Sequence, residues 1–458
     1  MSDISRIQER INLCIKGELW EQIPKFFEEL HPADIAEIIN HAPASAHNVL
    51  FDKVDDDIKP DVLAELDDQA EADILEELTA EEISDIVEEM APDDAADVLG
   101  ELEDERSEEI LELMEDEESD EVRELLQYDE DTAGGIMTTD IVAVRATMTA
   151  SEALSHIGAL DLEEPAYYAY VVDAEGKLTG YVQLWEILKH ANRHLTLEEL
   201  AEKETIVVHT DADQEEVARL ASKYDLNSLP VLDWQNKLVG RITVDDIMDV
   251  MEEEASEDIF KLAGSSESEL AYSSALHACK SRLPWLMITL FAGFVSSVIL
   301  KRFIDHHVVA LSFFVPIIMA MGGNTGIQSS TLIIRGLAIG SFTERELFKL
   351  LRRELMAGAM MGLICGTFIG GWAHFMVAGN SDIPSIYLAF TVGVSLFTSM
   401  TFAAVFGAFA PLLLNRFRID PAVASGPFVT ASNDILSLLI YYGITLALIL
   451  LRTHLMGP

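Results

Sequence analysis

Asp434 is the residue whose setting most clearly calls for a chemical role. It stands in SGPFVTASNDILSLLIYYGITLALIL, an apolar stretch over residues 425–450 that is typical of a membrane helix. An ionised carboxylate at that depth costs several kcal/mol on insertion scales. The neighbouring hydroxyl and amide side chains are those of Ser425, Thr430, Ser432 and Asn433. Polar oxygens around a lone carboxylate favour a water-lined cation path.

The alternative for Asp434 is a buried salt bridge, for which Arg335 is the obvious partner. The other acidic residues after residue 271 are expected in loops or at segment ends, which would leave Asp434 as the only carboxylate at membrane depth. These residues are Asp305, Glu344, Glu346, Glu354, Asp382 and Asp420.

A second polar motif lies in VPIIMAMGGNTGIQSSTLIIRGLA, residues 315–338. Its glycines interrupt an apolar segment, and its amides and hydroxyls offer neutral oxygens. Close helix packing through small residues would explain the glycines but not the density of amides. We therefore predict that this segment lines the path together with the residues around Asp434. The predicted pore-lining residues are Asn324, Thr325, Gln328, Ser329, Thr430 and Asn433.

A single carboxylate suits hydrated Mg²⁺ better than other metals. Mg²⁺ keeps most of its water and binds through one or two carboxylates, whereas Ca²⁺ needs several direct oxygen ligands. A site for softer metals would call for Cys, Met or His, and none lies beside Asp434. These arguments predict a Mg²⁺-selective path, with a divalent cation transporter for Mn²⁺ or Co²⁺ as the alternative.

Other function classes fit the sequence less well. An aspartyl intramembrane protease needs two carboxylates at depth and a zinc protease needs HExxH, and the chain has neither pattern. It also lacks a GxxxxGK[ST] nucleotide loop, and none is needed because a divalent cation enters down the membrane potential. We expect no enzymatic activity. A membrane Mg²⁺ sensor without a pore is a further alternative.

Charge is divided unevenly along the chain. Of 30 Lys and Arg and 80 Asp and Glu residues, about 12 and 7 lie in residues 271–458. The preceding part is strongly acidic, so it repels nucleic acid and attracts cations. Cys14, Cys279 and Cys365 lack the spacing of a metal or disulfide motif. The amino terminus shows no signal-peptide pattern, and we expect the acidic part to be cytosolic.

The elements that would position these residues begin with short helical repeats in residues 1–129. Phrases such as HPADIAEIIN, TAEEISDIVEEM and APDDAADVLGEL place a helix-starting residue near their beginning and then Ile, Leu or Val at helical spacing. Units this short cannot bury a core singly. We therefore expect them to stack into an acidic, α-helical, superhelical N domain.

Residues 130–190 and 191–243 form an internal repeat of β-rich runs and helices. Asp173, Lys177, Leu178 and Gly180 recur as Asp233, Lys237, Leu238 and Gly240. Two tandem α+β units of this kind resemble a pair of cystathionine-β-synthase (CBS) domains, a regulatory module. Residues 244–272 are predicted to form a long acidic connecting helix.

Five apolar segments follow, within an all-α transmembrane domain of residues 280–456. Each is long enough to cross about 30 Å of hydrocarbon. Basic residues gather at alternate ends, which predicts a multi-pass protein of the cell (inner) membrane with its amino terminus in the cytosol and its carboxyl terminus outside. The segments are approximately residues 283–300, 308–338, 355–378, 386–414 and 424–451.

Three motifs closely resemble the MgtE family of magnesium channels, and the likeness covers essentially the whole chain. They are PIIMAMGGNTGIQSSTLIIRGLA, IDPAVASGPFVTASNDILSLLIYYG and the connecting TVDDIMDVMEEEASEDIFKLAG. The resemblance implies a homodimer with its pore at the subunit interface and a connecting "plug" helix that closes the pore when cytosolic Mg²⁺ is high. It also implies that Asp434 holds the hydrated ion.

The resemblance further implies that acidic residues share Mg²⁺ ions between the N, CBS and plug elements. Repulsion would push these elements apart until divalent cations fill the gaps. The alternative is a generic solvated acidic surface. The implied metal ligands are Asp61, Asp93, Asp94, Asp97, Glu215, Asp225, Asp246, Asp249, Glu254, Glu257 and Asp258.

The sequence departs from the family pattern in two places. Ile327 stands where relatives often have a second Asn after GGNTG, which alters the polarity of that region. In GRITVDD, Gly240, Thr243 and Asp246 match a ribose-binding pattern of CBS domains, whereas the first unit, with GYVQLWE, does not. ATP binding through Thr243 and Asp246 is therefore a secondary hypothesis.

Overall fold

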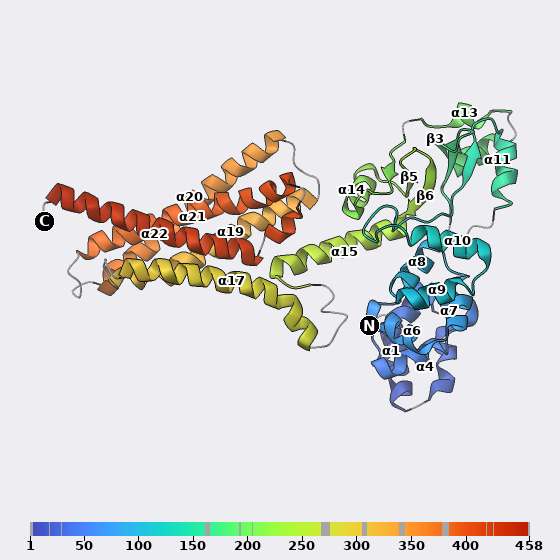
Figure 1. Ribbon diagram of the computed structural model, residues 1–458, viewed down its shortest axis with the longest axis horizontal. Helices are drawn as coiled ribbons and strands as arrows, with labels where there is room; N and C mark the ends of the chain where they lie inside the picture. Colours follow the sequence, from blue (N-terminus) through green and yellow to red (C-terminus); the bar gives the residue numbers. More distant parts are fainter. Residues whose placement is uncertain are drawn as a thin grey trace. The chain divides into compact units, whose positions relative to one another are not determined.

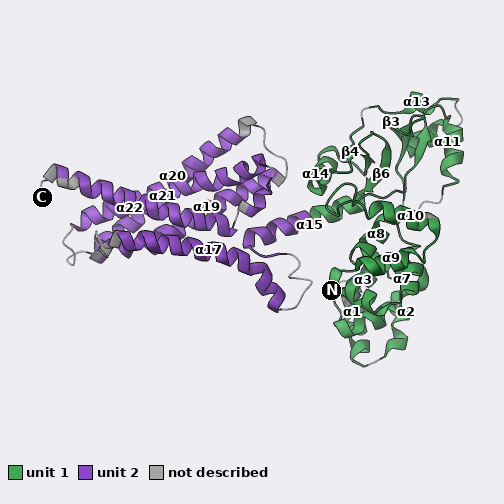
Figure 2. Ribbon diagram, viewed as in Figure 1, with its two compact units in different colours: residues 1–252 green, residues 253–458 purple. Residues whose placement is uncertain are grey.

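The computed structural model divides the chain into two compact units, residues 1–252 and residues 253–458 (Figure 2). The described residues are 3–17, 19–28, 30–160, 165–191, 194–203, 205–266, 275–304, 309–338, 344–377, 384–417, 419–424 and 426–456.

The first part of unit 1 is a succession of short helices (Figure 1). They are α1 (Asp3–Lys16), η1 (Trp20–Gln22), α2 (Pro24–Phe27), α3 (Pro32–Asn40), η2 (Ala44–Ala46), α4 (His47–Phe51), η3 (Asp56–Ile58), α5 (Lys59–Ala64), α6 (Asp68–Glu77), α7 (Ala80–Val87), α8 (Pro92–Gly100), α9 (Asp104–Leu111) and α10 (Asp116–Leu125). Residues at the amino-terminal ends of several of these helices favour helix initiation. Pro32 and Pro92 begin α3 and α8, where a helix needs no N–H donor, and Thr79 and Glu82 form a capping box at α7.

These helices bury their apolar faces together rather than singly. Leu63, Ile83 and Leu99 belong to one buried cluster that also includes Val231 and Ile242 of the second CBS unit. Apolar burial on this scale is what allows helices of ten residues or fewer to be stable. The prediction of a stacked helical N domain is confirmed.

Each half of the predicted repeat forms a three-stranded sheet. The orders are β1-β2-β3 and β4-β5-β6, and in both sheets the first pair is parallel and the second antiparallel. The strands are β1 (Ala143–Arg145), β2 (Tyr168–Val172), β3 (Leu178–Gln183), β4 (Val208–His209), β5 (Ser228–Leu232) and β6 (Leu238–Thr243), and the helices are α11 (Ala150–Ile157), α12 (Leu184–His190), α13 (Leu197–Leu200) and α14 (Gln214–Tyr224). The tandem α+β prediction is confirmed.

The repeated residues form the same hairpin turn in both sheets. Asp173 Oδ1 accepts a hydrogen bond from the backbone N–H of Lys177 at 2.8 Å, and Asp233 Oδ1 accepts one from Lys237 at 2.8 Å. An aspartate that binds backbone N–H groups ahead of it stabilises a tight turn. The sequence repeat is therefore a repeat of turn chemistry.

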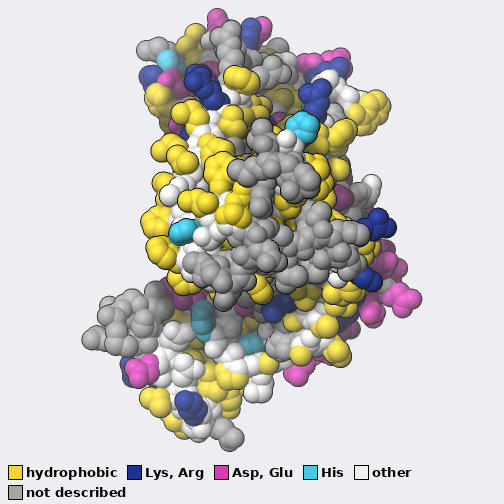
Figure 3. All heavy atoms as spheres, turned by 90° about the vertical axis from the view of Figure 1, so that its left-hand side faces the viewer, with side chains coloured by type: hydrophobic (Ala, Val, Ile, Leu, Met, Phe, Trp, Pro, Cys, Tyr) yellow, Lys and Arg dark blue, Asp and Glu magenta, His cyan; other side chains and the backbone are white. Residues whose placement is uncertain are grey.

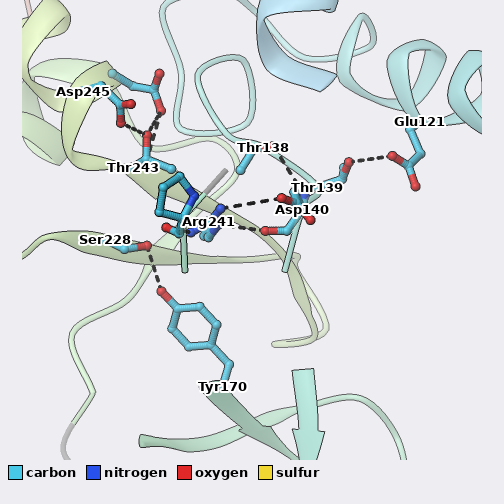
Figure 4. A network of polar contacts seen from close by, with 11 residues as sticks. Glu121, Thr138, Thr139, Asp140, Tyr170, Ser228, Arg241, Thr243 and Asp245 are labelled. Carbon is cyan, nitrogen blue, oxygen red and sulfur yellow. Dashed lines mark hydrogen bonds and ion pairs between the residues drawn. The ribbon is translucent and has the colours of Figure 1, made fainter. Parts of the chain in front are cut away.

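Polar contacts connect the two sheets (Figure 4). The Tyr170 hydroxyl of β2 lies 3.0 Å from Ser228 Oγ of β5. Arg241 Nε of β6 donates to the backbone oxygen of Asp140 at 2.7 Å, and the backbone N–H of Thr138 donates to the Arg241 oxygen at 2.8 Å. These buried bonds hold the CBS pair as one body.

Unit 2 consists of long helices. α15 (Val244–Ala263) begins in unit 1 and ends in unit 2. It is followed by α17 (Ala275–Ile304), α18 (Val309–Ser312), α19 (Val315–Ala338), α20 (Glu344–Val377), α21 (Ser385–Arg416), η4 (Pro421–Ala424) and α22 (Gly426–Met456).

Within the described ranges, four of these helices are long and apolar enough to cross a membrane. The candidate spans are Ala275–Arg302, Leu347–Met376, Ser385–Arg416 and Gly426–Leu451. α19 is not among them, although it is 24 residues long, because its polar GGNTGIQSST stretch lies mid-helix. A multi-helix membrane domain is thus observed as expected.

The outer surface of these helices is apolar. In the view of Figure 3, apolar side chains make up much of the described surface. Phe291 and Phe294 of α17 and Phe368, Trp372 and Phe375 of α20 are all at least 60% exposed. Exposed aromatic side chains in such numbers suit contact with lipid rather than water.

Glycines bring α20 and α21 close together. Gly358, Gly362, Gly366 and Gly370 recur every fourth residue of α20 and so share one face. A Cβ on Gly362 would lie only 2.8 Å from the backbone oxygen of Phe397 in α21. Small residues at this spacing let two membrane helices pack backbone to backbone.

Candidate functional site

Asp434 lies in α22, about two turns after the helix begins, and it faces α19. A Cβ on Gly323 of α19 would lie 3.5 Å from Asp434 Oδ1 and 3.4 Å from Thr430 Cγ2. The bare backbone of Gly323 therefore borders the carboxylate. Any larger residue there would fill the space beside it.

The other glycines of the α19 motif serve close packing. A Cβ on Gly326 would overlap the Asn433 amide and lie 3.1 Å from Val429 Cγ1 of α22. On α21, a Cβ on Gly407 would run into the backbone of Gly326. The packing interpretation of these glycines is therefore correct for Gly326, while Gly323 adjoins the carboxylate.

Asp434 is half-buried and, among the described residues, has no ion pair or hydrogen bond. Arg335, the partner considered for a salt bridge, is exposed, and its charge acts on Asp258 of α15, where it opposes part of the rise in pKa that burial and Asp420 cause. The salt-bridge alternative is not realised in this conformation. The carboxylate charge is available to a ligand.

The predicted pore-lining residues do not share one environment. Asn324 and Gln328 lie on the exposed side of α19, whereas Thr325 and Ser329 are buried. Thr430 is partly buried, with its hydroxyl donating to the Gly426 backbone oxygen at 2.8 Å. Asn433 is fully buried and has no hydrogen-bond partner among the described residues. It could reach a water path only if α19 and α22 moved apart.

Glu354 lies further inside its helix than the sequence predicts. It does not end a segment, because α20 begins ten residues earlier at Glu344 and Glu354 lies inside the candidate span Leu347–Met376. It is 5% exposed and accepts a hydrogen bond from Ser329 Oγ of α19 at 2.8 Å. Glu354 is thus a second acidic residue, besides Asp434, within the candidate spans. The sequence spacing indicates its burial, since Glu354 stands four residues before Gly358 and so lies on the glycine face of α20 that packs against α21.

In unit 1, Asp93 of α8 and Asp246 of α15 form the most buried acidic pair among the predicted metal ligands. Burial raises the pKa of Asp93, and burial together with the neighbouring Asp93 raises the pKa of Asp246 well above its usual value. Two carboxylates that cannot easily ionise side by side attract a proton or a metal ion. One or two carboxylates are what Mg²⁺ usually takes from a protein.

Further acids border this pair. Burial and the nearby Glu65 of α5 raise the pKa of Asp249, while Asp245 contributes to the raised pKa of both Asp246 and Asp249. Glu65 and Asp245 were not predicted as ligands, because the sequence does not say which faces of α5 and α15 meet. The acidic surfaces of the N domain and of the start of α15 thus face one another.

A second acidic group surrounds Asp97. Burial, followed by the charges of Glu101, Asp68 and Asp97, raises the pKa of Glu71 in α6 to about 8. Glu71 Oε1 is buried without a hydrogen-bond partner in the described structure. Asp97 itself is exposed. Asp97 is among the residues predicted from the sequence, whereas Glu71 is not, because its burial depends on the fold.

The remaining predicted ligands lie apart from these groups or contact other residues. Asp61, Glu215 and Asp225 are exposed, and Asp94 and Glu254 are partly buried. Across the described ranges, no three acidic, His or Cys side chains converge as a preformed metal cage. The described acidic residues provide pairs and open surfaces rather than a preformed cage.

The end of α15 carries its own cation. Lys261 Nζ pairs with Glu257 Oε1 and lies 2.7 Å from Asp420 Oδ2, in the loop that precedes α22. Burial alone would lower the pKa of Lys261, but the bonds to Asp420 and Glu257 outweigh it and raise the pKa. Burial and Asp420 raise the pKa of the adjacent Asp258. An ammonium therefore occupies a place among predicted metal ligands.

The predicted nucleotide residues bind one another. Thr243 Oγ1 donates to Asp246 Oδ2 at 2.7 Å, and the backbone N–H of Thr243 donates to the same oxygen at 3.1 Å. This is the local chemistry of a helix start at α15. A ribose would have to replace these bonds.

The fold and the site together define a class: a multi-pass membrane transport protein that carries a CBS pair and an acidic helical domain. Family comparisons match residues 315–444 to "MgtE: Divalent cation transporter", residues 30–131 to the "MgtE intracellular N domain", and residues 133–193 and 197–253 to the CBS domain.

Curated relatives extend this match. The "Magnesium transporter MgtE" of Thermus thermophilus is 40% identical over 322 residues, covering 69% of this chain and 70% of the relative. The protein of that name from Bacillus subtilis is 38% identical over 332 residues, covering 70% of each. The chain belongs to the MgtE family of magnesium transporters, which is a family of transporters and not of enzymes.

A solved structure matches about half of the chain. "Crystal structure of the cytosolic domain of the Mg2+ channel MgtE in complex with ATP" is 34% identical with a TM-score of 0.48, covering 54% of this chain and 99% of that one.

Proposed function

We propose that the chain is a Mg²⁺-selective channel that mediates passive Mg²⁺ influx and is closed by cytosolic Mg²⁺. The observation that carries this proposal is Asp434, an acidic residue on a membrane helix with no protein partner in the described structure, beside the bare backbone of Gly323. A hydrated Mg²⁺ can be held by such a carboxylate through its own water shell. No energy source is required, since a divalent cation gains roughly 4.6 kcal/mol on entering down 100 mV.

The pore of this proposal lies between two copies of the chain, so that two Asp434 carboxylates meet on a two-fold axis. The exposed side of α19 supports this, because the amides of Asn324 and Gln328 are exposed there in a single copy of the chain. The amino-terminal domains would be cytosolic and the carboxyl terminus outside.

Closure would come from the acidic elements. Asp93 and Asp246, together with Glu65 and Asp249, form surfaces that repel one another while ionised. Mg²⁺ that fills these gaps at high cytosolic concentration would hold α15 against the N domain. At low Mg²⁺ the surfaces would separate and α15 would be released. ATP binding by the CBS pair stays a secondary prediction.

The Asp434→Asn variant tests the pore. Amide replacement keeps the shape of the side chain and removes its charge, so Mg²⁺ uptake by vesicles containing the protein should fall by at least about tenfold. Mn²⁺ and Co²⁺ competition in the same vesicles would decide between a Mg²⁺-selective path and a general divalent one. Uptake that is unchanged relative to wild type, at equal amounts of membrane-inserted protein, would remove Asp434 from the pore.

A further inference from the structure

Glu354 is a buried carboxylate within a membrane helix that the proposed ion path does not use. Its Oε2 accepts from Ser329 Oγ at 2.8 Å, and its Oε1 lies 3.1 Å from Arg353 Nη2. Arg353 is mostly exposed, whereas Glu354 is almost completely covered. A carboxylate is retained at such a place only where its partners compensate for its desolvation. The arrangement needs an explanation beyond lipid packing.

The partner of Glu354 belongs to the motif that borders Asp434. Ser329 follows Gly323 by six residues on α19, which is about 9 Å along the helix and about 120° around it. Ser329 therefore contacts α20 while Gly323 contacts α22. α19 is held on different sides by two neighbours.

Around residues 322–326, α19 contacts α22 and α21 through glycines, whereas Val315 and Ile318 near its start pack in an apolar cluster with residues of both helices. Gly323 borders Asp434 and Thr430, and Gly326 lies between Asn433 and Gly407. Glycine contacts permit close approach, but they have no side chain that interlocks. A directed hydrogen bond, in contrast, sets both the position and the rotation of a helix. Ser329 supplies such a bond.

Glu354, which accepts the hydrogen bond from Ser329, lies where α20 packs closely against α21. Glu354 precedes Gly358 by one turn, and a Cβ on Gly358 would lie 3.1 Å from the Met400 backbone oxygen of α21. Leu350, also one turn from Glu354, packs in a buried cluster with Ile333 of α19 and Ala408 of α21. Glu354 therefore joins α19 to the rigid pair formed by α20 and α21.

We propose that Glu354 is a positioning residue for ion passage: by accepting the hydrogen bond of Ser329 it fixes α19 so that Gly323 stays beside Asp434. The inference rests on the proposed pore at Asp434. Glu354 does not touch the ion in this assignment. It acts through Ser329 and the backbone of α19.

The test compares Glu354→Gln, Glu354→Leu and Ser329→Ala in the full chain in vesicles, with Thr367→Val as control. Thr367 lies on the exposed side of α20, and its hydroxyl donates only within the helix, to Leu363 O at 2.7 Å. Mg²⁺ uptake per folded protein, the Mg²⁺ concentration at half-maximal uptake and the Mn²⁺-to-Mg²⁺ uptake ratio are measured.

Glu354→Gln should stay within about twofold of wild type in all three quantities, because its amide oxygen still accepts from Ser329. Glu354→Leu and Ser329→Ala should each lower uptake at least about fivefold and change the half-maximal concentration or the ion ratio. The double variant Ser329→Ala with Glu354→Leu should be no worse than either single one.

Two results would overturn the inference. Unchanged uptake and ion ratio in Ser329→Ala would show that the bond does not position α19, and this holds even if Glu354→Leu fails to fold. A loss in Glu354→Gln as large as in Glu354→Leu would show that the charge itself is needed, as in an ion site. If Asp434→Asn leaves uptake intact, the proposed pore fails instead.

Discussion

At the scale of single residues, two carboxylates of the membrane domain have opposite surroundings. Asp434 is half-buried without a described partner, and Glu354 is buried with Ser329 and Arg353 around it. A charge without a partner attracts a ligand, whereas a paired charge stabilises a helix contact. The two proposals therefore give the same type of side chain two different roles.

Glu71 makes a residue-scale prediction for stability. Its pKa is about 8 in the folded protein against an ordinary 4.5, so the folded state keeps a proton that the unfolded state loses. Stability should therefore fall as pH rises from about 4.5 to about 8 and level off above. Glu71→Gln should abolish that fall, raising stability at pH 8 by on the order of a few kcal/mol.

Thermal unfolding of the full chain in detergent and chelator, followed from pH 4.5 to pH 8.5, measures this effect. Glu76→Gln on the same helix is the matched control, because Glu76 is exposed. If Glu71→Gln and Glu76→Gln give the same pH profile as wild type, Glu71 ionises normally in the fold.

At the scale of elements, the end of α15 is fitted closely to the start of α22. Gly426 has φ +34°, and a Cβ there would run into the Leu262 backbone oxygen. Gly264 has φ +74°, and a Cβ there would lie 2.9 Å from Pro427 Cγ. Two glycines with positive φ thus permit the contact that Lys261 secures through Asp420.

Replacing Lys261 by Met should weaken that contact. Without the ammonium, Glu257, Asp258 and Asp420 lose the cation that pairs with two of them, and their repulsion opposes the docking of α15. We expect closure of the pore to require several-fold more cytosolic Mg²⁺ than in wild type, because Mg²⁺ must now take the place of the lysine.

Uptake into vesicles at graded internal Mg²⁺ measures the closing concentration, and protease cleavage of α15 without Mg²⁺ reports its docking. Lys203→Met, an exposed lysine of unit 1, controls for loss of charge. An unchanged closing concentration together with unchanged cleavage would show that Lys261 does not hold α15.

At the scale of the whole molecule, the proposed function assigns sensing to the acidic unit 1 and conduction to the apolar unit 2. Unit 1 brings Asp93 and Asp246 together from segments that are more than 150 residues apart in the chain. α15 runs from this pair in unit 1 to Lys261 in unit 2, so one helix is common to both.

Neutralising Asp93, Asp97 and Asp246 together with Asn tests the sensor. Removing the repulsion also removes the ligands, so the pore should remain active at Mg²⁺ concentrations that close wild type, and Mg²⁺ should no longer protect α15 from protease. The control is the triple variant Asp61→Asn, Glu215→Gln and Asp225→Asn, which neutralises the same number of predicted ligands at exposed positions. Closure and protection that persist in the first triple variant would assign those acids to a solvated surface.

Periodicity and local chemistry are visible in the sequence alone, and they were enough for the helical repeats, the CBS pair and the membrane helices. The Asp173 and Asp233 turns, the Thr79 capping box and the spans such as Gly426–Leu451 each depend on residues close in sequence. Asp434 is likewise visible in the sequence alone, because an acidic residue within an apolar segment can be identified without knowing its tertiary contacts.

Tertiary structure alone decided which charges are paired. Three contacts depend on which helix faces meet. Glu354 is buried against Ser329, Lys261 lies between Glu257 and Asp420, and Glu71 is covered. Electrostatic energies depend on distance and desolvation, and both arise only when segments far apart in sequence pack together.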